Sequence, residues 1–139
     1  MLTIDAGVWI ALYDPRDSFH HASDLFLTTV AERRLTLYGP AFVTIEAGCA
    51  LARRTQDVQA GRNAVERLNR YPLLTLLPVN ERLLSTAVDL GIRYRARGAD
   101  ALYVAAAALA NAPLVTWDAE LIQRAGALTP SDWLAKHAS

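Results

Sequence analysis

Four acidic residues stand at similar places relative to the apolar stretches of the chain. Asp5 follows "MLTI", Asp118 ends "APLVTWD", Asp100 precedes "ALYVAAAALA", and Glu46 is the only acid in the apolar stretch 41–54. An unpaired carboxylate beside a buried helix is costly, so each acid needs a partner. Converging carboxylates raise one another's pKa, and a hard divalent cation reverses that balance. The pattern therefore indicates a site for Mg²⁺ or Mn²⁺, which favour oxygen ligands and phosphate chemistry.

Each acid also has an explanation that involves no ligand. Asp5, Asp100 and Asp118 stand where an aspartate can cap the first turn of a helix. Glu46 could pair with an arginine or face solvent. A zinc site is disfavoured, because the three histidines, His20, His21 and His137, show no ligand spacing. A shared cation explains all four acids together, and capping stays open as the alternative for the aspartates.

Strands and helices alternate along the chain in a way that would bring these acids together. The predicted elements are a strand at 1–5, helices at 7–14 and 18–34, a strand at 35–40, a helix at 41–54 opened by Pro40, a helix at 57–70, a strand at 72–79, helices at 80–95 and 100–110, a strand at 112–118, a helix at 119–126, a small strand at 127–129 and a helix at 130–137. This order predicts an α/β fold with a mainly parallel central β-sheet flanked by α-helices, in a single domain over residues 1–139. Since parallel strands present their carboxyl ends to one edge, Asp5 and Asp118 should meet there, and the returning helices could deliver Glu46 and Asp100.

The composition of the chain says less about the class of protein than the four acidic residues do. The chain has 14 basic and 14 acidic residues, so its net charge neither indicates nor excludes a polyanionic partner. No apolar run is long enough to cross a bilayer, and the amino terminus lacks a basic start. The single cysteine, Cys49, permits no internal disulfide and is expected to pack as a small buried hydrophobe. We expect a soluble cytoplasmic protein with no membrane partner.

The order of these residues resembles a known family. Asp5 at a strand end, Glu46 in "IEAGCAL", Asp100 in "RGADALYVAAA", and Thr116 with Asp118 in "APLVTWD" are similar to the PIN-domain ribonucleases, and most similar to the VapC toxins of bacterial toxin–antitoxin pairs. The resemblance covers nearly the whole chain, and the segments around Asp100 and Asp118 are its most specific parts. It implies a PIN-like domain over residues 1–139.

The resemblance also implies an activity. It predicts a metal-dependent endoribonuclease that cleaves RNA phosphodiester bonds, with Asp5, Glu46, Asp100 and Asp118 as catalytic and metal-binding residues around Mg²⁺ or Mn²⁺, and with Thr116 in support. Asp5 and Asp100 are the candidates for direct ligands, whereas Glu46 and Asp118 could bind a second ion or act through water. A cognate antitoxin and a homodimer are the implied protein partners.

Arginines supply candidate contacts to the RNA. All basic residues except Lys136 are arginines, which suit bidentate contact with phosphate. Arg53, Arg95 and Arg97 are the possible RNA contacts, although such clusters often only cover solvated helix faces.

One residue departs from the family pattern. The family usually has Ser, Thr or Asn two residues after the first aspartate, and this chain has Gly7. A catalytically inactive PIN-like module that binds RNA or protein is therefore an alternative. A phospho-accepting signalling domain also gathers acids at a sheet edge, but here Ala6 and Gly7 replace the expected second acid, and Lys136 lies in the terminal helix.

Overall fold

The computed structural model describes residues 1–138 and has a parallel β-sheet at its centre. Its strands are β1 (Leu2–Ile4), β2 (Leu37–Pro40), β3 (Leu74–Leu77) and β4 (Leu114–Val115), in the order β3-β2-β1-β4. Its helices are α1 (Ala6–Tyr13), α2 (His20–Glu32), α3 (Val43–Thr55), α4 (Val58–Asn69), α5 (Glu81–Tyr94), α6 (Gly98–Ala110), α7 (Ala119–Ala125) and α8 (Pro130–His137). Every strand pair is parallel, which confirms the predicted α/β class.

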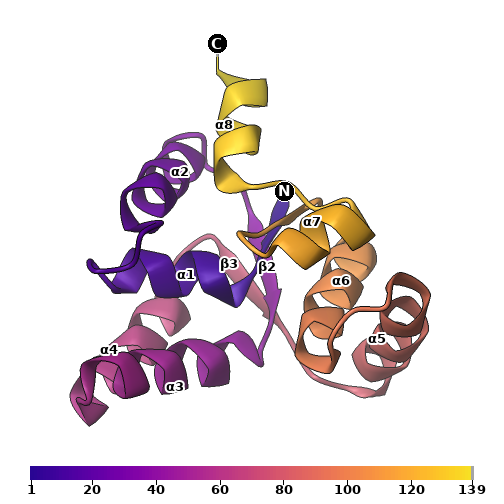
Figure 1. Ribbon diagram of the computed structural model, residues 1–139, viewed down its shortest axis with the longest axis horizontal. Coiled ribbons are helices and arrows are strands. Elements are labelled where there is room, and N and C mark those ends of the chain that lie inside the picture. Colours follow the sequence, from indigo (N-terminus) through magenta and orange to yellow (C-terminus); the bar gives the residue numbers. More distant parts are fainter. Residues whose placement is uncertain (139) are drawn as a thin grey trace.

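Helices cover the sheet from two sides. Figure 1 shows α1 to α4 on one side of the strands and α5 and α6 on the other. Helix α3 pairs with α4 and contacts α1, while α6 pairs with α5 and lies against β1 and β2. Because each parallel strand must return through a crossover, α1, α3 and α6 all start near the carboxyl edge of the sheet.

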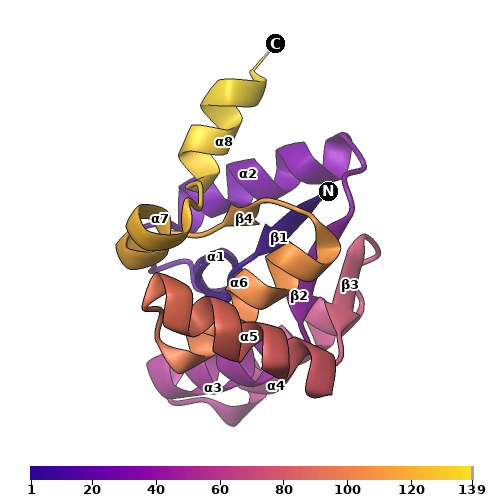
Figure 2. The same ribbon diagram turned by 90° about the vertical axis from the view of Figure 1, so that its right-hand side faces the viewer.

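The hydrophobic core packs around β1, one of the two inner strands of the sheet. Each residue of β1 is buried, and Trp9, Phe26 and Tyr103 are among the largest fully buried side chains. Helix α8 extends from the body of the molecule beside α2 (Figure 2), where Trp133 packs edge-on against Phe26. This aromatic contact attaches the last helix to the same core as the sheet.

Three local predictions are wrong or incomplete. Pro40 does not open a helix: it ends β2 opposite Leu77, and α3 begins at Val43. A proline suits either place, because its fixed φ and missing N–H fit a strand end as well as a first helical turn. Cys49 is exposed, since Val43, Ala47, Ala50 and Leu51 form the buried face of α3. Strand β4 has two residues, and residues 127–129 contribute one bridge, Val115 to Leu128.

No helix within residues 1–138 has both the length and the apolar character that a membrane span requires.

Candidate functional site

Asp5 is the buried centre of the acidic site. It follows the last residue of β1, and its backbone N–H donates to the Val115 carbonyl at 3.1 Å, which joins it to the neighbouring β4. The residue is only 9% exposed. Thr116 Oγ1 donates a hydrogen bond of 2.8 Å to Asp5 Oδ2. Strand pairing and this hydrogen bond together fix the carboxylate.

Thr116 also connects Asp5 to Asp118. The Asp118 backbone N–H donates to Thr116 Oγ1 at 3.0 Å, so the buried threonine hydroxyl accepts from one acid and donates to the other. The turn after β4 therefore holds two acidic residues in a fixed relation. These two hydrogen bonds give the Thr-x-Asp pattern of the sequence its structural role.

Glu46 and Asp100 reach the site from helices on opposite sides of the sheet. Glu46 is half-buried in the first turn of α3, and Asp100 is half-buried in the first turn of α6. Tyr103, also on α6, donates a hydrogen bond of 2.6 Å from its hydroxyl to Glu46 Oε1. The carboxylate of Asp100 accepts no hydrogen bond from any residue in 1–138.

The pKa values show that the four acids share one electrostatic environment. Burial raises the pKa of Asp5 to about 6; the Thr116 hydrogen bond partly opposes this, and the charges of Asp100 and Glu46 add to it. Burial also raises the pKa of Asp100, followed by the charges of Asp118 and Glu46, while Arg97 opposes the shift. Burial and the neighbouring acids act against the ionised form, whereas Thr116 and Arg97 favour it. The structure thus brings Asp5, Glu46, Asp100 and Asp118 together.

Capping explains only one of the three aspartates. The Asp118 carboxylate accepts from the backbone N–H groups of Glu120 and Leu121, at 2.8 and 3.2 Å, and caps α7. Asp5 occupies the N-cap position of α1 but makes no side-chain cap bond. Asp100 is not a cap, because α6 begins earlier, at Gly98, with Arg97 as its N-cap. The capping alternative therefore fails for Asp5 and Asp100.

The donor set suits a hard cation, although it is incomplete as a ligand cage. Among residues 1–138, no group of three or more His, Cys, Asp or Glu side chains lies close enough to form a metal site by itself. Mg²⁺ is commonly held by one or two carboxylates, with water and phosphate completing its octahedron. Asp5 and Asp100 are the candidates for such a pair, since neither carboxylate caps a helix. No ion pair with a basic side chain of residues 1–138 compensates any of the four acids.

The predicted arginine contacts differ in their relation to the acids. Arg97 Nε lies 3.6 Å from Glu120 Oε2, and its charge lowers the pKa of Asp100. Arg95 is exposed at the left-handed C-cap of α5, where its carbonyl accepts from Arg124. Arg53 is exposed in the last turn of α3, about 10 Å along the helix axis from Glu46. Arg97 is thus the arginine whose charge acts on Asp100.

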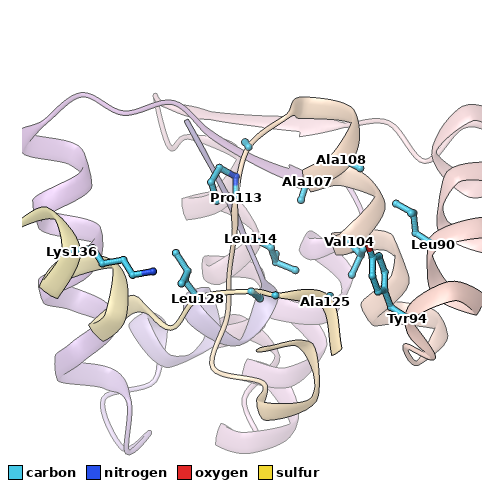
Figure 3. Close-up of a pocket in the computed structure, with 13 residues that line it drawn as sticks. Leu90, Tyr94, Val104, Ala107, Ala108, Pro113, Leu114, Ala125, Leu128 and Lys136 are labelled. Atoms are coloured by element: carbon cyan, nitrogen blue, oxygen red, sulfur yellow. The ribbon is translucent and has the colours of Figure 1, made fainter. Parts of the chain in front are cut away.

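A separate hollow lies toward the carboxyl-terminal end of α6. Figure 3 shows its lining, which includes Ala107, Leu114, Leu128 and, at its margin, Lys136. None of the four acids contributes to it. This apolar surface is distinct from the acidic site.

Sequence reasoning missed two contributors to the site. Tyr103 was expected only as part of an apolar helix, although it follows Asp100 by three residues and so shares its helix face. Arg124 lies 4.0 Å from Glu120 and donates to the Arg95 carbonyl at 2.7 Å, which places a second arginine beside Arg97. The i, i+3 spacing was the available signal for Tyr103.

The fold and the acidic edge define a recognisable class of protein. The family model described as PIN domain matches residues 2–127, and the chain belongs to the PIN-domain family. This assignment favours the ribonuclease and inactive-PIN hypotheses over a phospho-accepting signalling domain. No curated protein sequence matches the chain.

Solved structures with a similar fold come from several organisms. VapC20 of Mycobacterium tuberculosis, described as a sarcin–ricin loop cleaving toxin, shares 18% identity at a TM-score of 0.78, over 92% of this chain and 97% of that one. A toxin–antitoxin complex from Klebsiella pneumoniae shares 17% identity at 0.65, over 94% and 98% of the chains. FitAcB from Neisseria gonorrhoeae shares 18% identity at 0.69, over 96% and 99%. At these identities the likeness establishes the fold.

Proposed function

We propose that this chain is a Mg²⁺- or Mn²⁺-dependent endoribonuclease and the toxin component of a VapBC-type toxin–antitoxin system. The observation that carries the proposal is the convergence of Asp5, Glu46, Asp100 and Asp118, none of which forms an ion pair with a basic side chain of residues 1–138. The PIN-domain family and the fold shared with VapC20 support the same activity. A divalent cation would remove the electrostatic cost of keeping these acids ionised.

The position of each site residue suggests a different role for it. Asp5 and Asp100 would bind the cation, since neither carboxylate is used to cap a helix. Glu46 and Asp118 would bind a second cation or orient water, and Thr116 would hold Asp5 and Asp118 in register. A bound cation would supply Lewis-acid activation of water and neutralise charge on the phosphodiester.

Substrate contact is proposed for the arginines. Arg97 lies beside Asp100, and its guanidinium could take an RNA phosphate in place of its 3.6 Å contact with Glu120. Arg53 and Arg95 are exposed and would contact more distant parts of the RNA. Because the arginines and not the acids would read RNA shape, they would set which RNA is cut.

Cleavage of a structured RNA tests the activity directly. An oligonucleotide that contains a sarcin–ricin loop, together with total RNA, is incubated with the protein and Mn²⁺, with and without a chelator. We expect Mn²⁺-dependent cleavage that falls at least about 100-fold in Asp100→Asn. The matched control is Asp24→Asn, an exposed aspartate of α2. Cleavage that survives the chelator, or equal cleavage by Asp100→Asn, contradicts the proposal.

An inactive RNA- or protein-binding module is the second candidate, and Gly7 favours it. A Cβ at position 7 would lie 3.5 Å from Asp5 Oδ2, so the side chain that the family usually places here would contact the first acid. Its absence removes a hydrogen bond to the site. Mn²⁺-independent RNA binding without any cleavage would favour this candidate.

An antitoxin would use apolar surface close to the acids. A hollow between α3 and α4, lined by Ile45, Cys49, Val58 and Val65 among others, lies one residue along the chain from Glu46. Ile45 and Val58 are large exposed hydrophobic residues. The toxin–antitoxin complex among the similar folds supports such a partner. Coexpression with the neighbouring reading frame should yield a stable complex, and its absence counts against the partner.

A homodimer would cover another apolar surface. Leu84, Val88 and Ile92 follow one another at four-residue spacing along α5, and they are 47%, 58% and 75% exposed. Such a stripe is typical of a helix that packs against a partner. Sedimentation should give a dimer at micromolar concentration, and a monomer there contradicts it.

Residues 1–139 are proposed to form one domain that acts in the cytoplasm. The contact of Trp133 with Phe26 supports inclusion of α8, which lies beyond the residues matched by the family model. A ribonuclease with an RNA target and an antitoxin encoded beside it would meet both in the cytoplasm.

A further inference from the structure

Tyr103 makes the one side-chain hydrogen bond, within residues 1–138, between the two helices that carry Glu46 and Asp100. Its hydroxyl donates to Glu46 Oε1 at 2.6 Å. Glu46 is on α3 and Tyr103 on α6, and these helices lie on opposite sides of the sheet. The hydrogen bond therefore spans the carboxyl edge of the sheet at the acidic site.

The hydroxyl of Tyr103 is held in place by the packing of its ring. The residue is fully buried, so packing around the ring fixes where the oxygen lies. The full burial of the side chain also prevents it from touching RNA.

No other hydrogen bond within residues 1–138 holds the Glu46 carboxylate. Glu46 forms no ion pair with any residue of that range, and its side chain has several rotatable bonds. Without Tyr103 the carboxylate could turn toward solvent and away from Asp5 and Asp100, whose charges it faces. The ordering of Glu46 thus depends on one donor.

We propose that Tyr103 is a positioning residue that fixes Glu46 Oε1 and so keeps the Glu46 carboxylate directed at the cation site. The inference rests on the proposed metal-dependent nuclease. Helix α6 then contributes two groups from one face, the acid Asp100 and, three residues later, the hydroxyl that orients the acid of a different helix. Donors that orient a ligand or its water commonly change metal affinity 10- to 100-fold when removed.

Calorimetric titration with Mn²⁺ tests this role without relying on activity. Tyr103→Phe keeps the ring and removes only the donor, and we expect about 10-fold weaker Mn²⁺ binding. In RNA cleavage kcat should fall while KM stays unchanged, because a fully buried side chain cannot contact the substrate. The matched control is Tyr38→Phe, whose hydroxyl has one hydrogen-bond partner within residues 1–138, the Met1 sulfur at 3.7 Å. Wild-type Mn²⁺ affinity in Tyr103→Phe overturns the inference.

A double-mutant cycle separates positioning from a general structural effect. In a Glu46→Ala background, Tyr103→Phe should cause no further loss of Mn²⁺ affinity, because the two residues act as one unit. An equal loss in both backgrounds overturns the inference. If Tyr103→Phe does not fold, the ultraviolet difference spectrum of tyrosine on adding Mg²⁺ serves instead. This difference spectrum should appear in wild type and vanish in Glu46→Ala. Its persistence in Glu46→Ala overturns the inference.

The same titrations distinguish this inference from the function on which it rests. Wild-type protein that binds no Mn²⁺ removes both. Wild-type binding that is lost in Asp100→Asn but unchanged in Tyr103→Phe leaves the proposed function standing and removes only the role of Tyr103.

Discussion

The two ends of α1 each hold a buried aspartate, and the two carboxylates are in opposite electrostatic states. Asp5 at the N-cap is 9% exposed, and Asp14 at the C-cap is 6% exposed. Burial alone would raise both pKa values. At Asp14 the backbone N–H of Arg16 and the guanidinium of Arg54, which donate at 3.0 and 3.1 Å, outweigh burial and lower the pKa. At Asp5 the pKa rises to about 6.

The two carboxylates also differ in their partners. Arg54 joins α3 to the segment after α1 by contacting both Asp14 and Asp17, the latter at 2.7 Å. Asp5 instead faces Glu46 and Asp100, which add negative charge. The protein therefore supplies its own cation at one end of α1, and at the other end it gathers acids that a cation from solution would stabilise. This contrast is the physical reason for proposing a structural role for Asp14 and a role in cation binding for Asp5.

The largest effect on stability is expected when Asp5 is replaced by Asn and the free energy of unfolding is compared at two pH values. Because the folded pKa of Asp5 lies above its ordinary value of 3.8, its stabilising contribution is complete below that value and is lost as pH rises through about 6. The difference between the folded pKa of about 6 and the ordinary value of 3.8 corresponds to about 3 kcal/mol in the free energy of unfolding. Metal-free Asp5→Asn should therefore be more stable than wild type at about pH 7.5, by up to that amount, and similar to it at about pH 4.

Asp14→Asn should show the opposite sign in the same urea-unfolding measurements. Its folded pKa is lowered, so its contribution is present above 3.8 and is lost as pH falls below that value. The variant should be less stable than wild type at neutral pH and should approach it in acid. Destabilisation by both substitutions at neutral pH would remove the contrast between the two ends of α1.

Removing the cation at Asp14 should have a smaller effect. Arg54→Met keeps most of the aliphatic stem and leaves Asp14 buried without its guanidinium. We expect a loss of about 2 kcal/mol in the free energy of unfolding, less than for a fully buried pair because the Arg54 side chain is 40% exposed. Mn²⁺ binding should be unchanged. The control is Arg70→Met, whose partner Glu66 is exposed and whose loss should cost under about 1 kcal/mol; equal losses in the two variants would contradict the assignment.

The smallest effect is expected from restoring a hydroxyl beside Asp5. Gly7→Ser would place a Cβ 3.5 Å from Asp5 Oδ2, which is ordinary contact and leaves the hydroxyl free to donate to it. We expect Mn²⁺ affinity to rise roughly threefold, since a hydrogen bond to a charged group favours its ionised form. Gly7→Ala adds the same Cβ without the donor and should leave affinity unchanged. A similar gain in both variants would trace the change to the helix backbone.

The sequence predicts the arrangement of the sheet edge well, because that arrangement follows from strand order. The apolar stretches ending at Asp5 and Asp118 indicated parallel strands whose carboxyl ends meet, and the structure pairs β1 with β4 beside them. The role of Thr116 as a link between two acids depends on side-chain geometry, which only the structure gives.

Helix boundaries and side-chain partners could not be predicted in the same way. Asp100 was expected as a possible cap, but α6 begins two residues earlier, at Gly98, because Arg97 adopts the extended N-cap conformation. The pairing of Arg54 with Asp14 and the hydrogen bond of Tyr103 to Glu46 join residues 40 and 57 positions apart. Such contacts depend on how α1, α3 and α6 pack, and no local pattern in the chain encodes them.

Calorimetric titration of Mn²⁺ into wild type, Asp5→Asn and Asp14→Asn tests the central claim most directly. The account predicts binding by the wild type, no detectable binding by Asp5→Asn although its fold is retained, and wild-type affinity in Asp14→Asn. The two variants differ only in which end of α1 carries the substitution. Wild-type affinity in Asp5→Asn, or no binding by the wild type, would contradict the assignment of the acidic edge as a cation site.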